Sequence, residues 1–184
     1  RHYADMVAEK MIPVQWGILN GTGSSRCFCI DNFRVAAGEL DAEHRGVVFG
    51  DTDAYKWLEA VAYCANNGQT KYIPMADDLI ELIGRAQQPD GYLNTYYTVR
   101  EPGQRWQNLT EGHELYSAGH LIEAAVAYYE ATGKRRLLEI ASKFADLICR
   151  VFGPGEEQRH GYPGHQEIEL ALVKLWRVTG EERY

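Results

Sequence analysis

The sequence contains no uninterrupted apolar run of about 18 residues, few cysteines and no excess of positive charge. A membrane-spanning helix needs such a run, so we expect no membrane partner. The 184 residues carry a formal net charge of −7, whereas proteins that bind nucleic-acid phosphates normally present a basic face. We therefore expect no nucleic-acid partner. The length indicates one domain or part of one, and the composition leaves the oligomeric state open.

The cysteines are too few and too scattered for a disulfide framework. Only Cys27 and Cys29 are close in sequence, and Cys64 and Cys149 are isolated. A single Cys-x-Cys pair without further ligands does not make a zinc site. We therefore expect buried thiols in a reducing compartment, no signal peptide and a cytoplasmic location.

Hydrophobic residues recur at helical spacing over most of the chain. The stretch from Gly112 to Ala131 is apolar nearly all round, which is typical of a helix buried on both sides. We predict an all-α fold of about six helices, at 5–19 (with a kink or boundary at Pro13), 53–68, 71–87, 112–131, 135–153 and from 167 onward. Residues 29–53, 87–108 and 153–167 are expected to be irregular, with Asp51 or Asp53 capping the helix that follows.

One helical unit is repeated 47 residues later. Each copy has a buried helix, a Thr-Gly turn suited to a left-handed helix cap, and a charged start to a next helix. The matching residues are Leu121 and Ile168, Ala124 and Ala171, Val126 and Val173, Tyr129 and Trp176, and the turns Thr132-Gly133 and Thr179-Gly180. Two helices per unit predict a helical solenoid or a closed helical toroid. Because the chain ends where the second helix of its last unit would begin, we expect a fragment of a larger domain.

The segment "TEGHELYSAGH" contains two histidines, two glutamates and a tyrosine. His113 and His120 are seven residues apart, which separates them by about 10 Å along a helix, too far for one zinc ion. His113 stands at the start of a buried helix, and His165 stands at the matching start of the next repeat. In a toroid the two histidines would lie around one mouth of the ring. There, a histidine can donate a hydrogen bond to a sugar hydroxyl or accept one from it. The alternative is that each histidine caps a helix or fills a joint in the core.

Catalytic groups cannot be assigned from spacing. Glycosidases usually use two carboxylates, and the candidates here are Glu111, Glu114, Glu123, Glu167, Glu169, Asp51 and Asp53. The sequence has no G-x-S-x-G nucleophile motif, no G-x-G-x-x-G motif and no P-loop.

Four motifs resemble glycoside hydrolase family 127, the beta-L-arabinofuranosidase family. They are "DTDAYKWLEA", "QQPDGYLNTYY", "GHELYSAGHLIEAAVAYYEATGK" and "GYPGHQEIELALVKLWRVTGE", in order from about Asn20 to the end. The resemblance implies that residues 1–184 are the N-terminal half of an (α/α)6-toroid catalytic domain. It also implies a retaining hydrolase that releases terminal beta-L-arabinofuranose, with arabinofuranosides as partners.

Carried over by position, the resemblance implies that His113, His165 and Gln15 bind the sugar. It implies a zinc-bound cysteine nucleophile and a glutamate acid/base for the full-length protein, since zinc favours the thiolate. The family's nucleophile, acid/base and zinc ligands lie downstream of the matched motifs, so we expect no catalytic residue and no metal site in this chain. The remaining alternatives are a non-catalytic helical-repeat module that binds a glycan or protein, and another toroid enzyme such as an unsaturated glucuronyl hydrolase or a sugar epimerase.

Overall fold

The computed structural model describes residues 2–22, 25 and 27–184. These residues are largely helical, and among them β-structure is limited to one isolated bridge between Phe152 and Arg159. The elements are α1 (His2–Met6), η1 (Val7–Met11), α2 (Ile12–Leu19), α3 (Cys29–Ala36), α4 (Thr52–Asn66), α5 (Ile73–Ala86), η2 (Tyr96–Arg100), α6 (Glu114–Thr132), α7 (Arg136–Val151) and α8 (Glu167–Thr179). In the described part of the chain, no helix combines the length and apolar character needed to cross a membrane.

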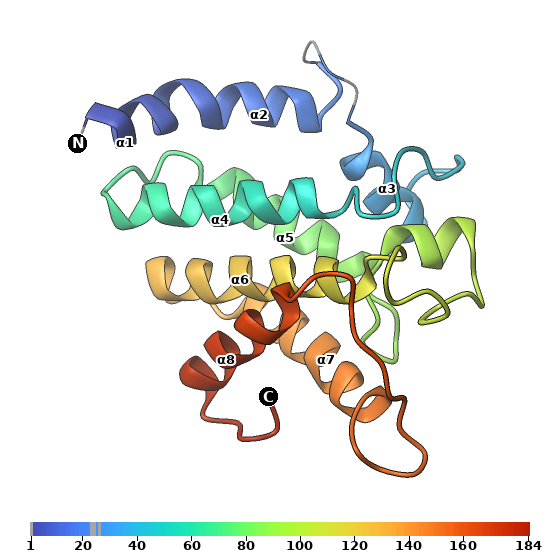
Figure 1. The fold of residues 1–184 in the computed structure, drawn as a ribbon. Helices are drawn as coiled ribbons and strands as arrows, with labels where there is room; N and C mark the ends of the chain where they lie inside the picture. Colours follow the sequence, from blue (N-terminus) through green and yellow to red (C-terminus); the bar gives the residue numbers. More distant parts are fainter. Residues whose placement is uncertain (1, 23–24, 26) are drawn as a thin grey trace.

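The helices form an arc of a helical toroid, as the repeat predicts. Helices α2, α4 and α6 lie side by side, and α8 continues the row on the far side of α6 (Figure 1). Helices α5 and α7 pack against each other and against this row. Helix α6 therefore has neighbours on several sides, which explains why its apolar residues surround it.

The repeat is reproduced down to its capping hydrogen bonds. Gly133 and Gly180 both adopt the left-handed conformation, with φ of 71° and 74°, and end α6 and α8. Each N–H donates to the carbonyl four residues earlier, and the preceding threonine hydroxyl also donates to a helix carbonyl. The predicted Thr-Gly helix ends are confirmed.

The two repeats differ at their N-terminal ends. Helix α6 has 19 residues and α8 has 13, so with the C-terminal caps aligned α8 begins six residues later in its repeat. Its first residue, Glu167, lies against Gly119, where an added Cβ would come within 2.6 Å of Glu167 Cγ and 3.0 Å of its carbonyl carbon. Gly119 thus allows the start of α8 to approach the side of α6.

Pro13 marks a change of helix type. The π-helix η1 ends at Met11 and α2 begins at Ile12, so Pro13 is in the first turn of α2. A proline cannot donate the next hydrogen bond, and its ring crowds the preceding turn. The wider π turn before Pro13 accommodates both effects.

The prediction of irregular structure from Cys29 to Asp53 was wrong in its first part. Residues Cys29–Ala36 form α3, which buries Cys29, Ile30 and Phe33. The helix is short and its buried face is completed by distant helices, so local periodicity is a weak signal for it. The expected loop 87–108 likewise contains the π-helix η2.

Candidate functional site

His113 occupies the N-cap position of α6 in a left-handed conformation, with φ of 53°. Its side chain makes no capping hydrogen bond. Instead, His113 Nδ1 lies 2.6 Å from the carbonyl oxygen of Glu111. Since a carbonyl can only accept, Nδ1 carries the proton, and Nε2 of the neutral ring has a free lone pair. His113 is therefore oriented as a hydrogen-bond acceptor.

Glu114 holds the loop before α6 in place. The Tyr92 hydroxyl donates to its carboxylate, and the Trp106 N–H donates to it over 2.6 Å. Trp106 has a φ of 64°, a strained conformation for a bulky residue, which this hydrogen bond offsets. Burial raises the pKa of Glu114 to about 7, against the opposing effect of these hydrogen bonds. One of the candidate carboxylates is thus a buried structural anchor.

His165 joins His113 from the loop that precedes α8. The two imidazole centroids are 5.2 Å apart, although 52 positions separate the residues in sequence. Gly164 makes this approach possible, because an added Cβ would collide with the Thr110 carbonyl oxygen. The sequence prediction that His113 and His165 lie at one mouth agrees with this geometry.

Two aromatic residues complete the group: Tyr116, the tyrosine of the segment that contains His113, and Phe49, which the sequence pattern did not indicate. Tyr116, one turn into α6, has its ring centroid 5.6 Å from His113 and 4.9 Å from His165. Phe49 comes from the loop before α4, with its centroid 5.1 Å from His113. We call Phe49, His113, Tyr116, His120 and His165 the histidine cluster.

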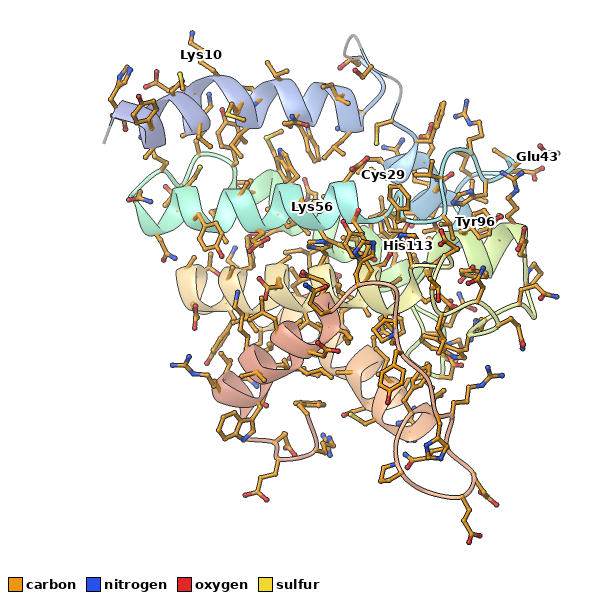
Figure 2. All side chains as sticks on the ribbon, viewed as in Figure 1. Lys10, Cys29, Glu43, Lys56, Tyr96 and His113 are labelled. Carbon is orange, nitrogen blue, oxygen red and sulfur yellow. The ribbon has the colours of Figure 1, made fainter. Side chains whose placement is uncertain are left out.

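Lys56 brings a positive charge to the histidine cluster. It lies on α4 near the start of α6, where His113 lies (Figure 2). Its ammonium donates to the Tyr116 hydroxyl over 2.9 Å and lies 5.3 Å from the centre of the same ring. The Tyr116 hydroxyl therefore retains its own proton to donate to a further acceptor.

His120 lies one turn after Tyr116 along α6 and is partly buried. Its Nδ1 is 3.3 Å from Glu167 Oε1. Burial, together with the positive charges of Lys56 and His165, lowers the pKa of His120 to about 4. At neutral pH this contact therefore places a neutral imidazole beside the Glu167 carboxylate and is not an ion pair.

Gln15, the third predicted sugar contact, is separate from the cluster. It is exposed on α2, which packs against α4. In the described part of the chain, no hydrogen bond joins it to His113 or His165. Its role remains a prediction.

Asp51 does not cap α4 with its side chain, although it occupies the N-cap position. Its carboxylate instead accepts from the Thr95 N–H and hydroxyl, over 2.7 and 2.5 Å. Thr95 Oγ1 is also 3.1 Å from Nε2 of the buried His44. Burial raises the pKa of Asp51 to about 6, while the Thr95 hydrogen bonds oppose this shift. Asp51 thus ties the loop before α4 to the start of η2.

The arrangement of potential metal ligands bears on the zinc ion that the family resemblance implies. Among residues 2–22, 25 and 27–184, no group of three or more His, Cys, Asp or Glu side chains is arranged to hold a metal ion. These residues therefore do not fit a zinc ion.

The fold places the chain among helical-toroid proteins, and comparisons identify the family. The family model "Beta-L-arabinofuranosidase, GH127 catalytic domain" matches residues 1–184. The chain therefore belongs to the GH127 catalytic-domain family, as its motifs indicated.

Individual relatives agree with this assignment. The chain is 43% identical, over 199 aligned residues, to a non-reducing end beta-L-arabinofuranosidase of Bifidobacterium longum subsp. longum, covering 98% of this chain and 30% of that protein. A solved GH127 beta-L-arabinofuranosidase from Geobacillus stearothermophilus T6 is 60% identical with a TM-score of 0.96, covering 99% and 29%. A solved GH127 beta-arabinofuranosidase is 38% identical with a TM-score of 0.86, covering 99% and 30%. The chain thus spans about 30% of the length of these relatives.

Proposed function

We propose that the full-length protein is a glycosidase that releases terminal beta-L-arabinofuranose, and that this chain supplies one wall of its sugar pocket. Family membership supports the activity. The observation that supports the pocket is the meeting of His113 and His165, from different helical repeats, at a ring-to-ring distance of 5.2 Å.

The chemistry of the histidine cluster suits a sugar. The free Nε2 of His113 accepts a hydrogen bond from a hydroxyl. The rings of Phe49 and Tyr116 offer apolar surface to the C–H groups of a furanose. The N-terminal end of α6 carries a partial positive charge, which favours a hydroxyl oxygen nearby.

Gln15 is retained in the proposal as a third sugar contact, provided by α2 at the end of the row of helices. Its amide can both donate to and accept from hydroxyls. Replacement by alanine tests this role through the KM of the full-length protein, and an unchanged KM rejects it.

The retaining mechanism, the cysteine nucleophile and the zinc ion are proposals for the full-length protein that rest on the family resemblance. Zinc would supply a thiolate at neutral pH. This chain's own residues would orient the sugar and shield it from water on one side. We therefore expect the isolated 184-residue chain to show no turnover of an aryl beta-L-arabinofuranoside, and measurable turnover would contradict the assignment.

The test of the pocket uses the full-length protein and an aryl beta-L-arabinofuranoside. His113→Asn keeps a residue type that tolerates the left-handed conformation, and His165→Ala removes the second imidazole. A neutral hydrogen bond contributes about 0.5–1.5 kcal/mol, so each change should lower kcat/KM by about two- to thirteenfold. His160→Ala is the matched control, because His160 is exposed in the same loop as His165. Equal kcat/KM values for all four proteins would reject the pocket.

A further inference from the structure

Cys27 and Cys29 are the closest pair of cysteine side chains in the fold. Their sulfur atoms lie 3.4 Å apart, and both are free thiols. Cys29, labelled in Figure 2, is the first residue of α3 and is buried. Cys27 precedes the helix and is half-buried. The pair thus combines one accessible sulfur with one protected sulfur.

The surroundings make the two sulfurs chemically different. Hydrogen bonding from Cys29 lowers the pKa of Cys27, against opposing effects of burial and of the Asp53 carboxylate. Hydrogen bonding to Cys27 and burial raise the pKa of Cys29. The thiolate is the reactive form of cysteine, so Cys27 is the sulfur that reacts first.

Bond formation requires only a small movement. A disulfide has a sulfur–sulfur distance of about 2.05 Å, compared with 3.4 Å between the thiols. Cys27 is outside the helix and one residue, Phe28, separates the pair. Among the described residues, its other side-chain hydrogen bond is to Asp53 Oδ2 at 3.5 Å, a weak interaction that a shift of Cys27 would break.

We propose that Cys27 and Cys29 form a reversible thiol–disulfide site that responds to peroxide. The Cys27 thiolate attacks hydrogen peroxide, so that an S–O bond forms, the O–O bond breaks and hydroxide leaves. The hydroxide takes up the proton that Cys27 released and becomes water. Cys29 then attacks the Cys27 sulfur, an S–S bond forms, the S–O bond breaks, and the second hydroxide leaves as water with the Cys29 proton. The two thiols together lose two electrons to the peroxide.

Cys149 provides an internal comparison. It is also half-buried, but its sulfur donates to the Arg183 carbonyl oxygen rather than facing a second thiol. Burial raises its pKa. Cys149 should therefore react more slowly than Cys27 and should not be protected by disulfide formation.

The experiment treats the full-length protein with hydrogen peroxide, removes the oxidant, and alkylates in denaturant before trypsin digestion. Cleavage after Arg26 and Arg34 releases residues 27–34, which contain Cys27 and Cys29 and no other cysteine. The expected result is recovery of this peptide without alkylation, lighter by two hydrogen atoms, and alkylated again after treatment with a thiol reductant. Peptides with Cys64 and Cys149 should remain alkylated.

Two variants separate the steps. Cys29→Ser should leave a sulfenic acid on Cys27 that a dione reagent captures, and Cys149→Ser should leave the pair's oxidation unchanged. The proposal is overturned if both thiols of the wild-type pair stay alkylatable while Cys149 is oxidised. It is also overturned if Cys27 proceeds to sulfinic acid while Cys29 remains a free thiol.

Discussion

Gly119→Ala tests how α8 is docked on α6. The new Cβ would lie 2.6 Å from Glu167 Cγ, 3.0 Å from its carbonyl carbon and 3.1 Å from its carbonyl oxygen. The Cγ atom can rotate away, but the two backbone atoms begin α8 and can move only with that helix. The substitution therefore separates the start of α8, and His165 before it, from α6.

Two opposing free energies decide the size of the effect. Alanine favours a helix over glycine by about 1 kcal/mol, and overpacking costs about 1–3 kcal/mol. Because the clash is with backbone, we expect a cost in the upper part of that range and a net loss of about 1–2 kcal/mol. Urea unfolding of the full-length protein gives the free energy directly.

Gly84→Ala is the matched control on α5. Its Cβ would meet the end of the Arg136 side chain at 2.6 Å and Ile140 Cδ1 at 3.0 Å. Arg136 pairs with the exposed Glu81 and can move into solvent, so helix propensity should offset the clash and leave stability nearly unchanged. If Gly119→Ala is as stable as Gly84→Ala and keeps the kcat/KM of the wild type, the close α6–α8 approach is wrong.

Three further changes test particular residues. Ser117→Ala should stabilise by about 1 kcal/mol in urea unfolding, because the buried Ser117 hydroxyl has no hydrogen-bond partner among the residues that the structure describes; a destabilised variant would show that the hydroxyl is bonded. Glu114 has its pKa raised from 4.5 to about 7, so the folded state holds an extra proton and its contribution to stability is lost as pH rises between these values. The free energy of unfolding of Glu114→Gln, relative to that of the wild type, should thus increase by about 3 kcal/mol between pH 4.5 and 7.5. A difference in unfolding free energy that does not change with pH would contradict the raised pKa. Lys56→Met removes a charge that lowers the pKa of His120, so an NMR titration should show that pKa rising; a constant value would refute this coupling.

The parts of the fold that depend on local sequence were predictable. The apolar pattern identified the long helices, and the Thr-Gly turns gave the ends of α6 and α8 because glycine readily adopts positive φ. Helix α3 was missed because its stability comes from burying Phe33 and Ile30 against distant helices. The capping role of Asp51 was wrong because Thr95, 44 positions away, competes for its carboxylate.

The candidate site was predictable only where it follows from the sequence repeat. The repeat indicated that His113 and His165 lie together, since corresponding helix starts meet at one end of a toroid. Phe49 and Lys56 were not identified, because a loop residue and an exposed lysine carry no periodic signal. The six-residue offset between the starts of α6 and α8 follows from Gly119 and Glu167, a contact visible only in three dimensions.

The central claim is that His113 and His165 form one sugar-binding wall. The direct measurement is an NMR titration of the imidazole ¹⁵N resonances of the full-length protein with L-arabinose, at concentrations that inhibit hydrolysis of the aryl substrate. We expect the His113 and His165 resonances to shift together while that of His160 stays unchanged. Inhibition by L-arabinose without a shift of either His113 or His165 would contradict it.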